Sequence, residues 1–493
     1  MKPTDEQTAI LDSHVQRLSV VALAGTGKTS TLRLFAEQNP RKRLLYLAFN
    51  RAIADEVRGS FPKNVTAKTT HSLALSGLRG RYNGQIGTMR KDELAESLRL
   101  GYSKMQVRVR VARHIQDTMQ HWFNSADERI APAHLPKALK LPQEKRDIRD
   151  RHIDEKSILG YAHQAWALMA EPARDDVLIP HDGYLKAFCQ SGVSLPYDVI
   201  LLDEAQDTNP CVLGLLEQQQ CRLCMIGDPY QSIYAWRGAV DAMQMPADQT
   251  LHLTGSFRFG PEIAAVGDHV LQWIDPNAPQ LRGLGKPGRI DGIVKGHQLG
   301  VFGRTNEGLF DAAAKLILHR PQASIGFIGG IRSYGFDAML EIFRLWSPDQ
   351  TPEDPEFRRF ETFEDLQDYA ENAGDVQLSQ RARLVETYNR RLPGIIDSLK
   401  KADAGPEAMN LFSTVHRAKG REVPQAVLCD DFSEMMNGAI PVDLAAEAKE
   451  SANPSAVWEN ARLRYVACTR PRFALRPDRE YTAYAAFMAS QAN

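Results

Sequence analysis

Small residues followed by a lysine and a threonine, Gly25-Thr26-Gly27-Lys28-Thr29, form the first segment of this chain that could do chemistry. An apolar run precedes them and a helical-looking run follows. Backbone N–H groups of such a loop can wrap phosphate oxygens, the Lys28 ammonium can reach the β and γ phosphates, and the Thr29 hydroxyl can hold Mg²⁺. The alternative is a purely structural turn. The spacing predicts a nucleotide-binding loop between a strand and a helix.

Two carboxylates end a second apolar run, Val199–Leu202, at Asp203 and Glu204. In a phosphate-loop enzyme, an acid at this position orders the Mg²⁺ shell, which is the role we expect for Asp203. Glu204 then fits the base that orients and deprotonates an attacking water. The alternative is an acidic helix N-terminus that the helix dipole favours.

Polar and aromatic residues follow two further predicted strands. Phe49 and Asn50 come directly after the run 44–48, and Thr70 and His71 follow the run 66–69. The carboxyl ends of parallel strands are where open α/β sheets bind ligands. Small hydroxyls at such an end suit a phosphodiester backbone. Phe49 as a core aromatic remains an equal alternative.

A fourth segment, 224–238, combines a phosphate sensor with rings and a cation. A strand ends at Gly-Asp-Pro, and Gln231 follows where it could sense a γ-phosphate. Tyr234, Trp236 and Arg237 offer aromatic faces and a positive charge together, on which bases stack without sequence preference. The alternative is an amphipathic segment that buries both rings.

Length, net charge and cysteine content limit which classes of protein this chain can belong to. The chain has 493 residues, which predicts two to four domains, and its 60 Lys and Arg against 61 Asp and Glu leave almost no net charge. Nucleic-acid binding would therefore depend on local basic patches. We expect no membrane span and no signal peptide. Cys221 and Cys224 have metal-like spacing but lie in a strand-like run, so a core role is favoured over zinc.

Eight motifs in a fixed order carry a resemblance that covers nearly the whole chain. The chain resembles the superfamily 1A DNA helicases of the UvrD/Rep/PcrA type, and within them the F-box-bearing DNA helicase, although we expect no F-box here. Resemblance to the latter lies at 328–331, 388–393 and 430–432. The motif segments are Asp5–Gln7, Ala22–Thr29, Asp203–Asp207, Gly227–Ala239, Leu253–Phe259, Val301–Asn306, Thr414–Glu422 and Glu459–Arg470.

The resemblance implies ATP and Mg²⁺ as cofactors, with two RecA-like domains facing each other across ATP. Arg258 and Arg470 would act as arginine fingers on the transferred phosphoryl group, beside Lys28, Asp203, Glu204 and Gln231. Residues implied in nucleotide binding are Gln7, Ala24, Gly25, Thr26, Gly27, Lys28, Thr29, Ser30, Phe257 and Glu422. Residues expected to contact DNA are Phe49, Asn50, Thr70, His71, Tyr234, Trp236, Arg237, Arg304, Asn306 and His416.

Three positions depart from the pattern of the relatives. Many relatives have an arginine that stacks on adenine where this chain has Ser30, and a base-contacting aromatic where it has Ala48. The last motif ends in Arg470-Pro471, and proline restricts the residue before it to extended geometry. These departures put three expectations in doubt: selectivity for adenine, the role of Phe49 in contacting a base, and the position of Arg470 as the second arginine finger.

We predict an α/β fold of two RecA-like P-loop NTPase domains with parallel sheets, interrupted by small, mainly helical insertions. Domain 1A would comprise residues 1–80 and 171–260, and insertion 1B residues 81–170. Domain 2A would comprise residues 261–330 and 405–493, and insertion 2B residues 331–404. Segment 81–170 is basic, which indicates either phosphate contacts or a solvated helix face.

The expected function is an ATP-dependent 3′–5′ single-stranded DNA translocase and helicase in DNA repair, recombination or genome defence. The alternatives are a translocase that strips proteins from DNA, and a DNA-sensing ATPase subunit that works with a separate nuclease. Expected partners are single-stranded DNA and junctions of single- and double-stranded DNA, with a nuclease or repair factor as the candidate protein partner and no membrane. The expected location is cytoplasmic, at the nucleoid if the protein is bacterial.

Overall fold

The computed structural model describes residues 2–78, 80–82, 84–145, 150–171, 177–234, 242–372, 375–435, 454–483 and 485. The chain divides into two compact units. The first comprises residues 1–22 and 27–253, and the second comprises residues 23–26 and 254–493. In the described part of the chain, every helix is too short or too polar to cross a membrane.

A six-stranded parallel sheet organises the first unit, in the order β3-β2-β4-β5-β1-β6. Because all strands run the same way, their carboxyl ends meet at one edge of the sheet. That edge receives the predicted phosphate loop after β1 and the carboxylates after β4. The strands are β1 (Arg17–Ala22), β2 (Leu44–Ala48), β3 (Val65–Thr69), β4 (Val199–Asp203), β5 (Arg222–Gly227) and β6 (Gln249–Leu253).

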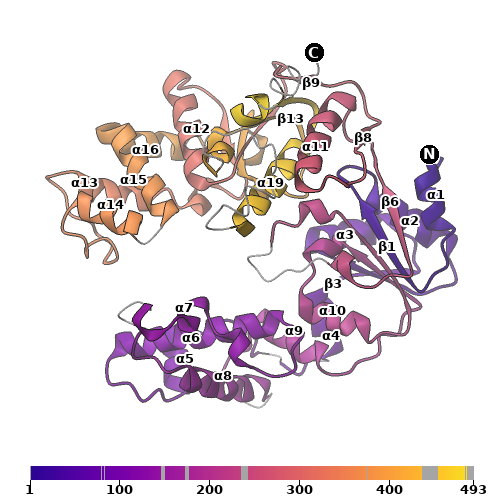
Figure 1. The fold of residues 1–493 in the computed structure, drawn as a ribbon, viewed down its shortest axis with the longest axis horizontal. Coiled ribbons are helices and arrows are strands. Elements are labelled where there is room, and N and C mark those ends of the chain that lie inside the picture. The colour runs from indigo at the N-terminus through magenta and orange to yellow at the C-terminus, as the bar shows by residue number, and fades with distance from the viewer. Residues whose placement is uncertain are drawn as a thin grey trace. The chain divides into compact units, whose positions relative to one another are not determined.

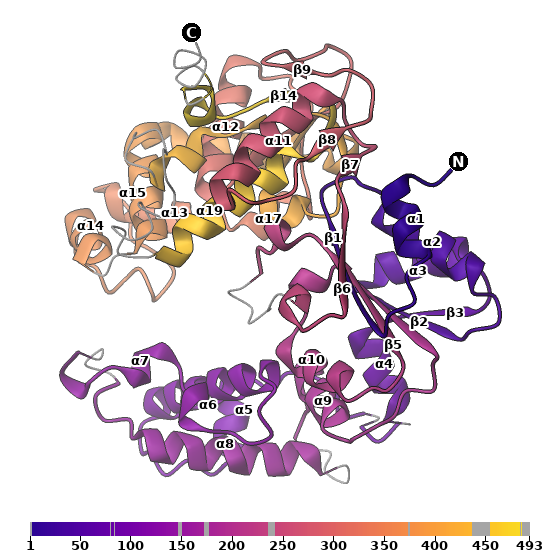
Figure 2. The same ribbon diagram turned by 45° about the vertical axis from the view of Figure 1, so that its right-hand side comes forward.

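Helices cover both faces of this sheet, and α5, α6 and α8 lie side by side in a separate helical layer (Figures 1 and 2). The α-helices are α1 (Asp5–Leu11), α2 (Lys28–Gln38), α3 (Arg51–Ser60), α4 (Thr70–Gly77), α5 (Lys91–Ser97), α6 (Met105–Asn124), α7 (Lys137–Lys140), α8 (Glu155–Ala170), α9 (His181–Cys189) and α10 (Pro210–Glu217). Short 3₁₀ turns are η1 (Pro132–His134), η2 (Gln143–Lys145), η3 (Ala205–Asp207), η4 (Pro229–Gln231) and η6 (Ala242–Gln244).

Strand β2, which lies between β3 and β4, shows why this sheet is buried on both faces. Leu44, Tyr46 and Ala48 pack into the core beside α2 and α3, whereas Leu45 and Leu47 pack into the core on the opposite face. Successive strand residues point to opposite faces, so an unbroken apolar run is what a doubly covered parallel strand requires. The sequence pattern and the observed layers therefore agree.

A second parallel sheet organises the second unit, in the order β11-β12-β10-β13-β14-β9. Together the two sheets confirm the predicted α/β class. The strands are β9 (Arg289–Ile290), β10 (Leu299–Gly303), β11 (Ile325–Phe327), β12 (Asn410–Thr414), β13 (Val423–Leu428) and β14 (Pro471–Arg476), with β7 (Gly255–Ser256) and β8 (Arg282–Gly283) forming a separate pair.

The helices α13 to α16 form a bundle in the second unit (Figure 2). They share one hydrophobic core with α12 and strands β10 to β12, through residues such as Phe310, Phe327, Val385 and Ile396. The helices are α11 (Pro261–Ile274), α12 (Asn306–His319), α13 (Ala338–Trp346), α14 (Phe363–Asn372), α15 (Val376–Tyr388), α16 (Leu392–Ala402), α17 (Val415–Ala418) and α19 (Pro454–Cys468). The 3₁₀ turns are η7 (Ile331–Tyr334), η8 (Asn389–Arg391), η9 (Gly405–Glu407) and η10 (Asp430–Met435).

A buried ionic cluster stabilises the end of the second unit. The Arg464 guanidinium donates to Asp478 at 3.0 Å and also pairs with Glu480, and all three side chains are at most 6% exposed. Removing one partner of a buried ion pair typically costs about 3–5 kcal/mol because the other charge stays buried.

We therefore expect Arg464→Ala to lower the unfolding temperature of this unit by roughly 6–20 °C, the shift that such a cost gives for a unit of this size. Differential scanning calorimetry measures this shift. Arg479→Ala is the matched control, because Arg479 is 89% exposed and pairs with a half-exposed Asp430. An equal shift in both variants would contradict the explanation.

Candidate ATP and DNA sites

The phosphate loop joins β1 to α2, whose first residue is Lys28. Gly27 precedes the helix in the left-handed region, at φ 83°, which L side chains rarely adopt. The Thr26 hydroxyl donates to the carbonyl oxygen of Leu23 at 2.8 Å and closes the turn. The small residues of the motif are thus explained by the backbone geometry of the loop.

Lys28 lies against the carboxylates that follow β4. Its ammonium donates to Glu204 at 3.0 Å, and the two side chains are 15% and 21% exposed. Burial alone would lower the pKa of Lys28, but Glu204, Asp203 and Asp228 outweigh it and the pKa is raised. Lys28 is therefore held fully charged at the strand edge, as phosphate binding requires.

Asp203 is buried beside Tyr46, whose hydroxyl donates to it at 2.6 Å and also interacts with the Thr29 side chain. Burial, and then the charge of Glu204, raise the pKa of Asp203 to about 6. A carboxylate and a hydroxyl are hard oxygen donors that suit Mg²⁺, which usually keeps several waters and takes further oxygens from substrate phosphates. Asp203 and Thr29 therefore fit this ion.

Glu204 stands in a strained conformation, at φ 50° and ψ 46°, which is uncommon for any residue but glycine. The Gln206 amide donates to its carboxylate at 2.6 Å. The Gln206 side-chain oxygen Oε1 accepts from the backbone N–H of Asp228 at 3.0 Å, and a Cβ at Gly227 would meet that oxygen at 2.4 Å. Gln206 thus fixes the candidate base relative to the end of β5.

Other predicted nucleotide contacts of the first unit lie nearby in the fold. The Gln231 amide donates to Asp228 at 2.6 Å and is buried. The Gln7 amide donates to Thr31 of α2 at 3.0 Å and takes part in the N-terminal cap of α1. Ser30 is exposed on α2. The adenine-reading role implied for Gln7 stays a prediction.

Arg258 is held by two groups of its own unit. Its guanidinium donates to Glu422 at 2.9 Å and to the carbonyl oxygen of Thr469 at 2.8 Å. Arg470 is 2% exposed, and its Nε donates to the carbonyl oxygen of Val466 at 2.9 Å. The two predicted fingers therefore lie on neighbouring stretches of backbone. The Arg258 side chain is 13% exposed, and Arg470 is buried.

Residues 23–26 also pack within this unit. The N–H of Phe257 donates to the carbonyl oxygen of Gly25 at 2.9 Å, and the N–H of Ala24 donates to the Tyr465 hydroxyl at 3.2 Å. A Cβ at Gly25, where φ is +74°, would meet Ser256 Oγ at 2.5 Å. The Phe257 ring is 42% exposed, so it remains available to a ligand.

Two predicted DNA-contacting aromatics of the first unit come together. Phe49 follows β2, and its ring stacks on Tyr234 with centroids 5.7 Å apart and planes inclined by 16°. Phe49 is 43% exposed, which excludes the core role that remained open. Asn50 caps α3 by accepting from the N–H of Ile53 at 3.0 Å. Trp236 and Arg237 lie outside the described residues.

His71 is the second residue of α4, directly after Thr70. It contacts the carboxylate of Asp182, which the sequence analysis did not identify. Its Nε2 lies 3.1 Å from Asp182 of α9, and the Gln120 amide donates to the other carboxylate oxygen at 2.7 Å. The hydrogen bond from His71, together with that from Gln120, lowers the pKa of Asp182 against the effect of burial. Asp182 therefore stays charged and fixes the His71 ring.

The predicted DNA contacts of the second unit lie at the carboxyl ends of β10 and β12. Arg304 and Asn306 flank Thr305, which caps α12. His416 lies on α17 with its Nε2 3.6 Å from Glu459. These positions correspond to the strand edge that binds ligands in open parallel sheets.

Two of the clustered arginines of the basic segment have carboxylate partners. Arg110 donates to the buried Asp150 at 3.1 Å, and Arg113 lies 3.8 Å from Asp117. These contacts explain part of the charge of α6 structurally.

The two spaced cysteines lie in the core, as favoured from the sequence. Cys224 is fully buried on β5 and packs with β1 and β2 residues, whereas Cys221 packs against the core on the opposite face. Among the described residues, the structure groups no three His, Cys, Asp or Glu side chains in a way that could hold a metal ion.

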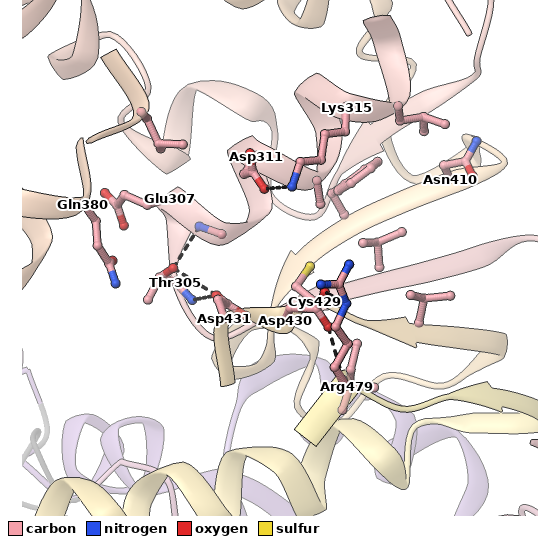
Figure 3. Close-up of a pocket in the computed structure, with 18 of the residues that line it drawn as sticks. Thr305, Glu307, Asp311, Lys315, Gln380, Asn410, Cys429, Asp430, Asp431 and Arg479 are labelled. Carbon is pink, nitrogen blue, oxygen red and sulfur yellow. Dashed lines mark hydrogen bonds and ion pairs between the residues drawn. The ribbon is translucent and has the colours of Figure 1, made fainter. Parts of the chain in front are cut away.

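A cavity of about 560 Å³ lies in the second unit between the sheet and helices α12 and α15 (Figure 3). Val301, Phe412 and Val427 contribute apolar side chains from the sheet. Asp311 and Lys315 form an ion pair on α12 at 2.6 Å, and Asp431 lies against Thr305 at the other end. None of the predicted ATP or DNA residues lines it, and no sequence motif pointed to it.

The stacked pair makes a testable contribution to DNA binding. We expect Phe49→Ala and Tyr234→Ala each to weaken single-stranded DNA binding by roughly 5–150-fold, since base stacking contributes about 1–3 kcal/mol per base. Fluorescence anisotropy with a labelled oligonucleotide measures the affinity. Leu75→Ala is the control, because Leu75 is an exposed apolar residue. Phe61→Ala would not serve, because the Phe61 ring packs on Tyr46. Unchanged affinity in both aromatic variants would contradict the stacking role.

Comparison with known proteins agrees with this geometry. Residues 3–250 match the family described as the UvrD/REP helicase N-terminal domain. The chain is 33% identical over 467 residues to F-box DNA helicase 1 of Gallus gallus, covering 88% of this chain and 45% of that protein. It is 25% identical over 513 residues to F-box DNA helicase protein 1 of Schizosaccharomyces pombe, covering 95% and 56%.

A shorter match, 25% identical over 311 residues, relates the chain to DNA helicase II of Salmonella typhimurium, covering 54% of this chain and 40% of that protein. The chain thus spans about half the length of these curated relatives. The family match covers half of the chain and includes the phosphate loop, both carboxylates and the stacked rings. This chain therefore belongs to the UvrD/REP helicase family.

Proposed function

We propose that this chain is an ATP-dependent single-stranded DNA translocase that moves 3′ to 5′ and unwinds duplex DNA. One observation supports the proposal above all: Lys28, Asp203 and Glu204 meet at the same strand edge of one sheet that carries the stacked Phe49 and Tyr234. A hydrolysis site and a base-stacking site are thus joined by a rigid parallel sheet. The helicase names of the relatives support the same assignment.

The residues suggest how hydrolysis would proceed. Lys28 would bind the β and γ phosphates, and Asp203 with Thr29 would hold Mg²⁺, which neutralises phosphate charge when bound. Glu204 would orient the attacking water and accept its proton. Arg258 and Arg470 would stabilise the charge that develops on the transferred phosphoryl group. We propose each of these roles, and each can be tested by substituting the residue.

Movement would follow from coupling these two sites. Strand ends that carry both carboxylates and DNA-contacting side chains transmit small shifts at the phosphates directly to the bases. If the two units alternate their grip on one strand during the ATP cycle, each cycle moves the protein along that strand. We propose that the same cycle separates duplex DNA at a junction.

A tailed-duplex assay tests direction and unwinding together. We expect ATP-dependent strand separation of a duplex with a 3′ single-stranded tail, and little separation when the tail is 5′ or absent. The reverse preference would refute the proposed direction. Directional displacement of streptavidin from a biotinylated single strand, without unwinding, would favour the protein-stripping alternative. A stable nuclease or repair partner in native mass spectrometry would favour the subunit alternative.

A further inference from the structure

The carboxylate of Asp431, which follows β13, holds the backbone turn at the end of β10. It accepts from the N–H of Arg304 at 3.1 Å, from the N–H of Thr305 at 2.7 Å and from the Thr305 hydroxyl at 2.9 Å. Figure 3 shows Asp431 directed at Thr305. The carboxylate and its three donors are 126 or 127 residues apart in sequence. Together these hydrogen bonds fix a turn that has no regular secondary structure.

The same residue also orients the Arg304 side chain. The Arg304 Nε donates to the backbone carbonyl oxygen of Asp431 at 3.0 Å. Arg304 is therefore held at both its backbone N–H and its guanidinium by one residue. Since an unheld arginine samples many rotamers, this arrangement lowers the entropy that ordering Arg304 on a ligand would otherwise cost.

The Asp431 carboxylate packs closely against the start of α12. Thr305 caps α12 by accepting from the N–H of Gly308 at 2.9 Å. A Cβ built at Gly308 would lie 2.2 Å from Asp431 Oδ2, far inside contact distance. The glycine thus allows the carboxylate to approach the helix start. Asp431 is 8% exposed, and burial raises the pKa of its carboxyl. The three donors act in the opposite direction and favour the charged form.

We propose that Asp431 is a positioning residue, which holds the turn 303–306 so that Arg304 and Asn306 present their side chains to the DNA backbone. This inference rests on the proposed function, because it assumes that these two side chains contact DNA. Asp431 itself does not touch the strand. It acts through the backbone that it holds.

The chain offers a matched control one residue away. Asp430 has the same side chain but is half-exposed, and it pairs with the exposed Arg479. Surface ion pairs of this kind contribute little. Asp430→Ala should therefore leave DNA binding and ATP hydrolysis unchanged, whereas Asp431→Ala should weaken DNA binding.

The first experiment measures ATP hydrolysis by the full chain against the concentration of an oligothymidylate. For Asp431→Ala we expect the half-maximal DNA concentration to rise about 10-fold, the effect of losing hydrogen bonds to a charged group. The rate at saturating DNA should change much less, because high DNA concentration compensates for a poorly held contact. Asp431→Asn should recover part of the affinity. An unchanged half-maximal concentration would overturn the inference.

A double-mutant cycle separates positioning from a general loss of stability. Gly308→Ala should also weaken DNA binding, because its methyl group displaces the carboxylate. The built methyl group also lies 2.7 Å from the Asp431 Cβ, so the cycle uses Asp431→Gly as its second single variant. On that background the methyl group meets neither atom, and its additional effect should be small. Additive effects would indicate two independent destabilisations and would contradict the proposal. Unfolding temperatures of all variants are measured alongside.

Arg304→Ala distinguishes failure of this inference from failure of the proposed function. If Arg304→Ala weakens DNA binding and Asp431→Ala does not, only the positioning role is wrong. If neither changes binding while the wild-type chain still binds DNA, Arg304 is not a DNA contact and the inference fails with it. If the wild-type chain does not bind single-stranded DNA, the proposed function itself fails.

Discussion

Replacing Glu204 by glutamine should lower DNA-stimulated ATP hydrolysis by about 10²–10⁴-fold, the usual contribution of a positioned general base. Glutamine keeps the size of the side chain and can still accept from Lys28 and Gln206, which lie within 3.0 Å of the carboxylate. It cannot take the proton of an attacking water. ATP binding, measured with a fluorescent analogue, should therefore persist while turnover is lost.

The exposed Glu217 on α10 provides the matched control. Its backbone carbonyl oxygen accepts from Arg17, and its side chain lies at the surface. Glu217→Gln should hydrolyse ATP at the wild-type rate. If Glu204→Gln retained more than about a tenth of wild-type turnover, well above the loss expected for a general base, another group would have to activate the water.

Replacing Lys28 by alanine should reduce hydrolysis by about 10²–10³-fold, the effect of removing one preorganised group that stabilises developing charge. The substitution should also change the pKa of the neighbouring carboxylates. Without the ammonium, Asp203 and Glu204 face each other without their neighbouring cation, and the pKa of Asp203, already raised to about 6, should rise further. ATP binding should therefore weaken along with turnover, unlike in Glu204→Gln.

Lys42→Ala is the control for this substitution, because Lys42 is exposed in the loop before β2. Isothermal titration calorimetry with ATP, and a steady-state hydrolysis assay, separate binding from turnover. Wild-type affinity and turnover in Lys28→Ala would show that the loop after β1 does not bind the phosphates, whatever its backbone geometry.

The parts of the site that are local in sequence could be predicted from it. The loop around Lys28 and the carboxylates after β4 follow apolar runs, and parallel pairing then brings their ends to one edge. The exposure of Phe49 was left open, because an apolar ring after a strand fits a core as well as a ligand surface. Its stack with Tyr234 depends on the fold of a segment 185 residues further along the chain.

The residues that hold the site in place could not be predicted. Tyr46 reads as one more apolar residue of a buried strand, and only the fold shows its hydroxyl on Asp203. Asp182 lies 111 residues from the His71 side chain that it holds, and Asp431 lies 127 residues from the Arg304 backbone N–H that it holds, so no spacing pattern relates them. Such contacts need the folded chain, whereas a phosphate loop is recognisable from its own residues.

The insertion boundaries at 81–170 and 331–404 remain predictions, although both ranges contain the expected helices. The helices after β11 share the core of the second unit through residues such as Phe336, Ile342 and Leu392. A segment that shares a continuous apolar core moves with it, because separating the two exposes that surface to water. Independent motion of this segment is therefore not expected.

The rate of ATP hydrolysis with and without single-stranded DNA tests the central claim most directly. With Mg²⁺ and saturating ATP, we predict that an oligothymidylate raises turnover of the wild-type chain at least about 10-fold, and that Phe49→Ala shifts the DNA concentration required, as loss of one stacked base implies. A turnover rate that stays the same at every DNA concentration would contradict the coupling between the carboxylate site and the stacked rings.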